Sequence, residues 1–325
     1  MTKKLTRRAV VGSLAAGLVA RRARAEGDWP TRTITVIHGF PAGGPSDVIA
    51  RLLADGLGRA LGQAVIVESR PGASGTVAAG LVARAVPDGY TLSVIPSGHA
   101  SAAATFASLP YRSVDDFTTI SLAYEYPYVM ATHIDSGFKS VAGLVAAAKK
   151  RPGALLYGTP GVGSGPQLAI ELFALQTKIK VTHVPYRGSA PAVMELLAGR
   201  LDFMMDPPAT MMEFIGNGKL RALAVSSLKP YFALPSAPTI AESGVPGFDV
   251  SAWQGLIAPA GLSERILKRL NAETVRILND PATVERMHTF GNEASPSTPE
   301  QFKKRLVDDI AKWTAVADEI HFQKI

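Results

Sequence analysis

Residues 38–47, HGFPAGGPSD, decide how this chain folds. An apolar run that ends at Ile37 leads into this stretch, and a helical pattern of apolar residues from Val48 to Leu57 follows it. A strand therefore feeds a glycine-bearing loop that opens a helix. Unpaired N–H groups and the helix dipole at such a start favour a negatively charged ligand. An ordinary turn between a strand and a helix has the same pattern, so this loop alone leaves both interpretations open.

The first 25 residues are typical of a secretory signal peptide. Residues 3–8 carry four basic side chains, residues 9–20 are apolar and uncharged, and Ala23-Arg24-Ala25 is a cleavage motif. The apolar core is too short to span a membrane. The pair Arg7-Arg8 favours the twin-arginine route over the general one. We therefore expect a periplasmic protein that is cleaved near Ala25.

Loss of this leader removes the excess positive charge. The whole chain has 34 Lys and Arg against 27 Asp and Glu, but seven of the basic residues and none of the acidic ones lie in residues 1–25. The mature chain is therefore neutral and shows no basic stripe with interleaved aromatic residues, so we expect no nucleic-acid partner. The chain has no cysteine, which excludes disulfides, thiolate chemistry and cysteine-based metal sites.

Strand and helix patterns alternate along the mature chain, which predicts an α/β fold with parallel-rich sheets flanked by helices. Weak boundaries near residues 124–127 and 226–235 predict that residues 125–226 form a second lobe, inserted between the two parts of a first lobe (26–124 and 227–325). Strands are expected at 33–37, 64–68, 91–95, 128–132, 155–157, 181–184, 203–205, 222–225 and 251–257. Helices are expected at 46–61, 76–85, 141–150, 167–176, 190–197, 263–278 and from a capping box at Thr298 onwards.

Three further glycine-bearing loops open helices, at residues 68–75, 158–166 and 184–191. In the first of them, Arg70 could pair with an anionic ligand or with Glu68. In the last, Tyr186 could line a ligand site or simply pack. Asp206 ends an apolar run, where a carboxylate would lie in the ligand zone of an α/β sheet or would cap the segment that starts at Pro207-Pro208.

Enzyme motifs are absent from the sequence. The six histidines have no metal-ligand spacing, and no serine lies in a G-x-S-x-G motif. The loop at 158–166 fits neither the dinucleotide fingerprint nor the Walker loop. His38, although near the first loop, is more typical of a structural histidine. We expect a binding protein with neither cofactor nor metal.

The chain also resembles the substrate-binding proteins of tripartite tricarboxylate transporters, the Bordetella-uptake-gene group. The matching segments span nearly the whole mature chain. They are Trp29-Pro30, Phe40–Gly44 with Asp47, Arg70–Gly72, Pro87–Leu92, His183–Tyr186 with Gly188–Pro191, Leu220–Val225, Pro238-Thr239 with Glu242, Trp253 and Leu256–Gly261.

This resemblance implies a two-lobed, flytrap-like periplasmic-binding-protein fold of type II. Each lobe would hold a mixed, mostly parallel sheet, and the lobes would close on a small carboxylate held largely by backbone N–H groups. It further implies delivery to membrane transporter subunits, by a protein that we expect to be a monomer. The residues expected to bind the ligand are Phe40, Ala42, Gly43, Gly44, Asp47, Ser74, Ser97, Thr159, Gly163, Ser164, Tyr186, Gly188, Ser189, Ala190 and Asp206.

Several positions depart from the family pattern and bear on the ligand more than on the fold. Pro45 stands where serine or threonine is usual, which removes one N–H and one hydroxyl from the first loop. Gln167, Arg187 and Pro207 are further departures. Phe40, Tyr186, Met204 and Met205 are apolar candidates near the cleft, so aromatic acids are admitted as readily as aliphatic ones. A sensory protein with the same fold is the alternative function, and a secreted enzyme acting on a carboxylate is a remoter one.

Overall fold

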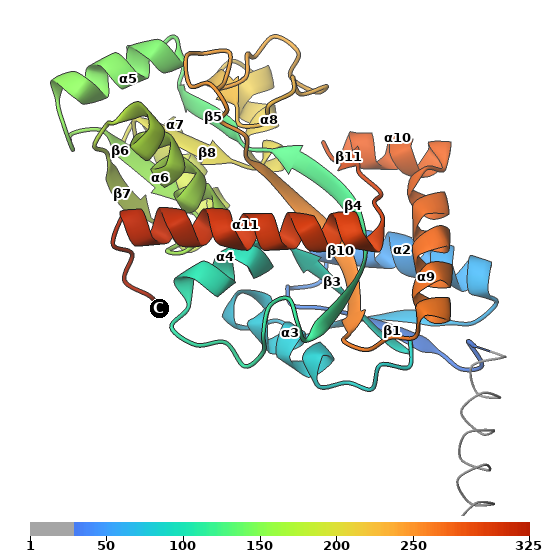
Figure 1. Cartoon of the computed structure of the whole chain (residues 1–325). Helices are drawn as coiled ribbons and strands as arrows, with labels where there is room; N and C mark the ends of the chain where they lie inside the picture. The colour runs from blue at the N-terminus through green and yellow to red at the C-terminus, as the bar shows by residue number, and fades with distance from the viewer. Residues whose placement is uncertain (1–28) are drawn as a thin grey trace, which may run out of the picture.

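The computed structural model describes residues 29–325 and contains two sheets, each flanked by helices, which form two lobes (Figure 1). The predicted signal peptide lies outside the described residues. The mixed α/β class and the two-lobed architecture are confirmed. The lobe boundaries stay a prediction.

The first sheet has the strand order β11-β4-β10-β3-β1-β2. Strands β1 (Ile34–His38), β2 (Val65–Ser69) and β3 (Thr91–Pro96) are parallel to one another. Strands β10 (Ser251–Pro259), β4 (Phe117–Pro127) and β11 (Glu293–Ala294) add antiparallel pairs. The parallel part places the loops after β1, β2 and β3 at one edge of the sheet.

The second sheet has the order β7-β6-β8-β5-β9. Strands β6 (Leu156–Thr159), β7 (Thr182–Pro185) and β8 (Phe203–Asp206) are parallel, and β5 (Val129–His133) pairs antiparallel with β8 and with β9 (Leu220–Val225). Both sheets contain fewer parallel strand pairs than the alternation of strand and helix patterns suggested. The reason is that the strands next to the connections between the lobes, β4 and β10 in the first sheet and β5 and β9 in the second, form antiparallel pairs.

Helices cover both faces of each sheet. In the first lobe, α2 (Pro45–Leu61) and α9 (Glu264–Leu278) share one core with Val94 and Leu256. The neighbouring residues Ile95 and Ile257 face the opposite core, as the two-residue period of a strand requires. The other helices are α3 (Thr76–Ala83), α4 (Gly98–Thr105), α5 (Val141–Lys150), α6 (Gly165–Thr177), α7 (Ser189–Leu197), α8 (Pro208–Gly216), α10 (Pro281–Thr289) and α11 (Pro299–Glu319), with a short 3-10 turn at Ala73–Gly75.

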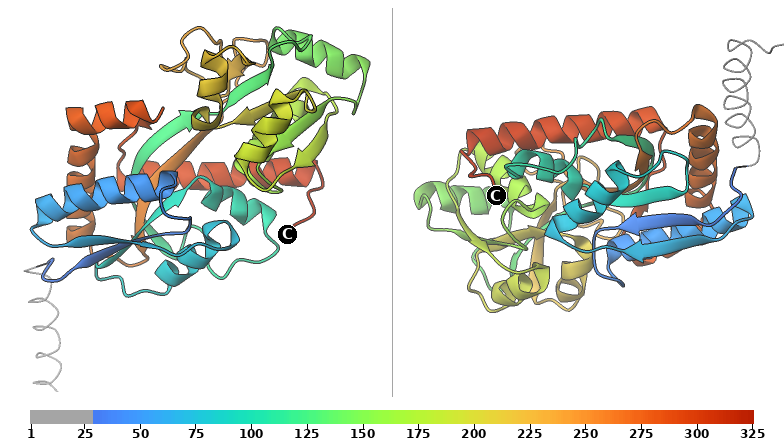
Figure 2. Two further views of the ribbon diagram at one scale, coloured as in Figure 1. Left: turned by 180° about the vertical axis from the view of Figure 1, so that it is seen from behind. Right: turned by 90° about the horizontal axis from the view of Figure 1, so that it is seen from below.

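Helix α11 lies across both lobes (Figures 1 and 2). Its buried Trp313 and Val316 belong to a core that also contains Trp253 of the first sheet and Tyr157 of the second. The predicted capping box is confirmed: Thr298 accepts from the N–H of Gln301, whose side chain accepts from the N–H of Thr298. The helix therefore joins the two lobes through one continuous apolar core.

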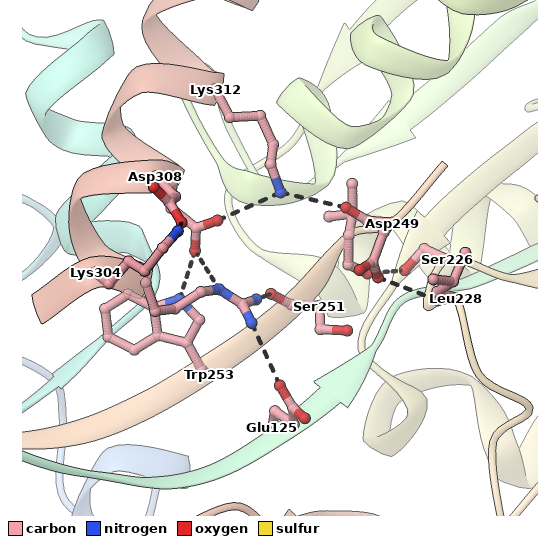
Figure 3. Close-up of polar contacts among 12 residues, drawn as sticks. Glu125, Ser226, Leu228, Asp249, Ser251, Trp253, Lys304, Asp308 and Lys312 are labelled. Carbon is pink, nitrogen blue, oxygen red and sulfur yellow. Dashed lines mark hydrogen bonds and ion pairs between the residues drawn. The ribbon is translucent and has the colours of Figure 1, made fainter. Parts of the chain in front are cut away.

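A buried carboxylate ties α11 to strand β10. Asp309 is 3% exposed. Trp253 Nε1 and Arg305 Nε donate to its Oδ2 at 2.7 and 3.0 Å, and Lys312 Nζ lies 3.4 Å from Oδ1. Figure 3 shows this network reaching Ser251 and Glu125, because Arg305 also donates to the Ser251 carbonyl at 2.9 Å. Helix α11 is thus bonded to both strands that run between the lobes, β10 and β4.

Ser226 joins the passing segments beside this network (Figure 3). Its hydroxyl accepts from the N–H of Tyr128 at 2.8 Å and donates to the Val250 carbonyl at 2.6 Å. Its own N–H and carbonyl pair with the same two residues. Ser226 therefore holds the two chain segments that connect the lobes side by side.

Most elements were predicted from the sequence, but β4, β11, α4, α8 and α10 were missed. Helix α4, with the sequence GHASAAAT, carries no apolar stripe, so no helical period marks it. Strand β4 runs through the boundary proposed near residues 124–127, and its residues are buried on both faces, which hides the alternation of a half-exposed strand. Within residues 29–325 no helix is both long enough and apolar enough to cross a bilayer.

Candidate functional site

A cavity of about 790 Å³ lies between the two lobes. Its first-lobe wall comes from Gly43 and the start of α2. Its second-lobe wall comes from Ser189 at the start of α7 and from Pro207–Met212 at the start of α8. Three helix N-termini thus meet at one cavity, where their dipoles and unpaired N–H groups favour an anion.

The four glycine-bearing loops are called loop one (residues 38–47), loop two (68–75), loop three (158–166) and loop four (184–191). Loop one is held in shape by the side chain of Asp47. Gly43 has φ +82°, a left-handed conformation that glycine adopts without strain. Its N–H donates to Asp47 Oδ2 at 2.9 Å, and Arg51 Nε donates to the same oxygen at 2.9 Å. His38 Nε2 lies 3.0 Å from Asp47 Oδ1, and both side chains are buried. Arg51, with the Gly43 N–H and His38, lowers the pKa of Asp47 to about 2.

Loop three repeats this arrangement in the second lobe. Gly163 has φ +75°, and its N–H donates to the side chain four residues on, Gln167 Oε1, at 2.7 Å. Ser164 caps α6 by accepting from the N–H of Gln167. Strand, glycine loop and helix therefore follow one another in the same way at residues 34–57 and 155–176, and in each loop the N–H of a glycine donates to the side chain four residues on.

The four loops form two pairs, one in each lobe. Loops one and two touch closely, because a side chain on Gly39 would lie 2.4 Å from Gly75 Cα and one on Gly75 would lie 3.2 Å from the Phe40 ring. Loops three and four are joined by bonds from Tyr186 N to the Thr159 carbonyl and from Gly188 N to the Pro160 carbonyl, each 3.0 Å. A change in the conformation of one loop therefore alters the contacts of the other loop of its pair.

Several amide groups on the loops beside the cavity remain without an acceptor; of these residues Ser189 lines the cavity itself, and Phe40 lines the smaller cavity next to it. Within the described chain, no acceptor is hydrogen-bonded to the N–H of Phe40, Ala42, Ser189 or Ala190. Proline at 45 leads α2 and lines the cavity without an N–H of its own. The donors therefore come from the residues before α2 and from the first turn of α7.

Asp206 is a buried carboxylate beneath the second-lobe wall. It is 0% exposed, and Thr210 Oγ1 donates to its Oδ2 at 2.7 Å. Its Oδ1 has no partner among residues 29–325. Burial raises the pKa of Asp206 to about 6, against a smaller lowering by the hydroxyls of Ser189 and Thr210. The group consequently titrates close to neutral pH rather than near 4.

Asp206→Asn is expected to raise the free energy of unfolding at pH 7, by at most about 3 kcal/mol for a shift of this size. The pKa of Asp206 is higher in the folded protein than in the unfolded chain. The wild-type protein is therefore most stable below about pH 4, where Asp206 is protonated in both states, and its free energy of unfolding falls as pH rises through 6. Urea unfolding between pH 4 and 7 measures the difference. Parallel profiles of the two proteins across this window would contradict the assignment.

The structure brings some of the predicted site residues to the cavity and directs others elsewhere. Gly43 and Ser189 line the cavity, while Phe40 and Ser74 line a small neighbouring one inside the first lobe. Thr159 is fully buried and is bonded to His183 Nε2 at 2.6 Å. Ser97 interacts with the Tyr128 hydroxyl. The others lie on the four loops described above: Ala42, Gly44, Gly163, Ser164, Tyr186, Gly188 and Ala190.

Some residues serve the fold instead of the cavity. Met204 and Met205 were expected near the cleft, but both are fully buried in the cores on either face of the second sheet, so they cannot line it. Arg70 pairs with Glu68 at 2.8 Å. His38 is the structural histidine that the sequence suggested, because its ring faces Asp47 inside the lobe.

Sequence reasoning missed the aromatic and α10 contributions to the cavity. Tyr124 and Tyr126 of β4 form part of its wall, as do Tyr231 and the turn around Phe290. The alternation of tyrosine in Tyr124-Glu-Tyr126-Pro-Tyr128 is a strand signal that could have revealed the first two. No local pattern links Tyr231 to the turn that follows α10, where its hydroxyl donates to the Gly291 carbonyl at 2.6 Å.

Comparison with known proteins identifies the family. The model of the tripartite tricarboxylate transporter family receptor matches residues 49–322. The chain belongs to this family. The protein BugT of Bordetella pertussis is 35% identical over 294 residues, which cover 90% of each chain.

Two solved structures of this receptor fold carry ligands. Rpa4515 of R. palustris, solved with adipate, is 33% identical with a TM-score of 0.77 and covers 89% of this chain and 97% of its own. MatC of Rhodopseudomonas palustris, with bound malate, is 33% identical with a TM-score of 0.74, covering 89% and 99%. The family and the function expected from the sequence, a solute-binding receptor for a transporter, are thereby confirmed.

Proposed function

We propose that this receptor captures a small organic carboxylate between its lobes in the periplasm and delivers it to a tripartite tricarboxylate-type membrane transporter. The observation that carries the proposal is the meeting of the α2 and α7 N-termini at one interlobe cavity, together with N–H groups that have no acceptor within residues 29–325 on the loop before α2 and on the first turn of α7. A carboxylate there would accept hydrogen bonds from both lobes at once. The adipate and malate of the two neighbours support this ligand class.

Ligand binding would then shift the protein toward its closed form. A carboxylate that bonds Ala42 of one lobe and Ser189 of the other gains both sets of contacts only when the lobes are together, which is the differential affinity that a population shift needs. The passing segments at Ser226 would act as the hinge. A monomer suffices for this cycle, since both walls come from one chain.

Asp47 is assigned a positioning role within this proposal. Its carboxylate is occupied by Gly43, Arg51 and His38, so it braces loop one and leaves the ligand to the backbone. The remaining predicted residues on the loops, Phe40–Gly44 in the first lobe and Gly163, Ser164, Tyr186 and Gly188–Ala190 in the second, shape the two halves of the cradle.

A thermal-shift screen of the mature chain against mono-, di- and tricarboxylates tests the proposal. A carboxylate at a hundred times its Kd should stabilise the folded state by about 2.7 kcal/mol through mass action. Stabilisation by a sugar or a cation, with none by any carboxylate, would overturn the proposal. Time-resolved NMR of a stabilising ligand should show no consumption, whereas turnover would favour the enzyme.

A further inference from the structure

The interlobe cavity is apolar over most of its wall. On the first-lobe side, Val48 and Leu52 of α2 face it, and Tyr126 of β4 lies between the lobes. On the second-lobe side, Pro208 and Met212 of α8 close it. Ala209, Tyr231, Ala233, Met287 and Phe290 complete the apolar lining.

Four of these side chains, those of Val48, Leu52, Tyr126 and Met212, are neither fully buried nor fully exposed. Each therefore keeps apolar surface in contact with the cavity. Covering such surface is favourable by about 25 cal/mol per Å², so a ligand with hydrocarbon of its own would bind better than one without. The gain requires walls on both sides, which α2 and α8 supply.

The charges of the lining favour an anionic ligand. The lining contains Arg286 and His288 and no aspartate or glutamate. Both side chains are exposed on α10, where water screens their charge, whereas the wall formed by Val48, Leu52 and Met212 is apolar. A further carboxylate placed against that apolar wall would be an unpaired charge, which is costly.

We propose that this receptor selects a monocarboxylate with an apolar body of the size of a ring or a medium chain. The carboxylate lies at the N-termini of α2 and α7, and the hydrocarbon lies between Val48, Leu52 and Met212. This inference rests on the proposed function, since it refines the ligand of the same cavity.

Calorimetric titration of the mature chain with benzoate, hexanoate, malate and adipate tests it. We expect benzoate or hexanoate to bind at least about tenfold more tightly than malate, because one or two buried methylene equivalents contribute that much. Equal or tighter binding of malate and adipate would overturn this inference and leave the receptor proposal standing. Failure of every carboxylate would overturn both.

A matched pair of variants tests the placement of the hydrocarbon. Met212→Glu puts a charge into the apolar wall, whereas Met194→Glu makes the same change at a side chain that is 59% exposed on α7. The first should weaken benzoate binding at least about tenfold and the second less than twofold. Equal effects would contradict the placement.

Val48→Thr gives a second test in case Met212→Glu fails to fold. The substitution keeps the shape of the side chain and adds one hydroxyl to the wall. It should weaken benzoate binding several-fold more than malate binding.

Discussion

Valine in place of Gly43 is expected to abolish ligand binding while the protein stays folded. A side chain at this position meets nothing within 4 Å, so the effect comes from the backbone and not from a clash. At φ +82° a β-branched residue costs about 1–3 kcal/mol, and the loop would leave this conformation to escape the strain. The bond from Gly43 N to Asp47, and with it the orientation of the neighbouring N–H groups, would be lost.

The size of this effect follows from the hydrogen bonds to the carboxylate. Two bonds to a charged group contribute about 1.5–3 kcal/mol each. Their loss lowers affinity by roughly a hundredfold or more. Isothermal titration of the variant with the ligand of the wild-type protein measures the change directly.

Gly62 at the other end of α2 supplies the control. It has φ +68°, and a side chain there also meets nothing within 4 Å. Gly62→Val should therefore cost similar stability and leave affinity within about twofold of wild type. If both variants bind normally, loop one is not part of the site. If both lose binding, the effect is one of global destabilisation.

Asp309→Ala should produce the largest loss of stability. The variant leaves Trp253 Nε1 without its acceptor and removes the partner of Arg305 and Lys312 between α11 and the passing strands. Breaking a buried ion pair in this way costs about 3–5 kcal/mol. With an unfolding entropy of about 2.1 cal/mol/K per residue, a loss of 3 kcal/mol lowers the Tm of a chain of about 300 residues by roughly 5 °C.

The adjacent residue Asp308 provides a matched control. Its side chain is 53% exposed and pairs with Lys304 on the surface of α11. Asp308→Ala should change stability by less than about 1 kcal/mol, because exposed pairs contribute little. Calorimetric unfolding of both variants compares them, and similar Tm values would show that the buried network does not hold the lobes together.

The fold was largely predictable from local sequence. Strands such as β1 and helices such as α2 carry strong apolar periodicity, and the capping box at Thr298 marks the start of α11 by its own residues. Strand β4 and helix α4 escaped because their residues are buried on both faces or are uniformly small. Burial of that kind is decided by neighbours that are distant in the chain.

The candidate site was predictable only in part, for the same reason. Glycine loops with helix starts are local features, so Gly43 and Ser189 could be proposed from the sequence. The use of Asp47 and Gln167 as internal braces, and the burial of Met204, depend on packing that no spacing reveals. The contribution of α10 to the cavity arises from a tertiary contact between Tyr231 and Gly291.

The carboxylate claim is tested most directly by titrating the mature chain with acids and their neutral amides in matched pairs, such as benzoate with benzamide and adipate with adipamide. Acid and amide share their shape and differ in charge. The account predicts that at least one acid binds with a Kd near the micromolar range and that its amide binds at least roughly a hundredfold more weakly, as the loss of charge-assisted bonds implies. An amide that binds as tightly as its acid would contradict it.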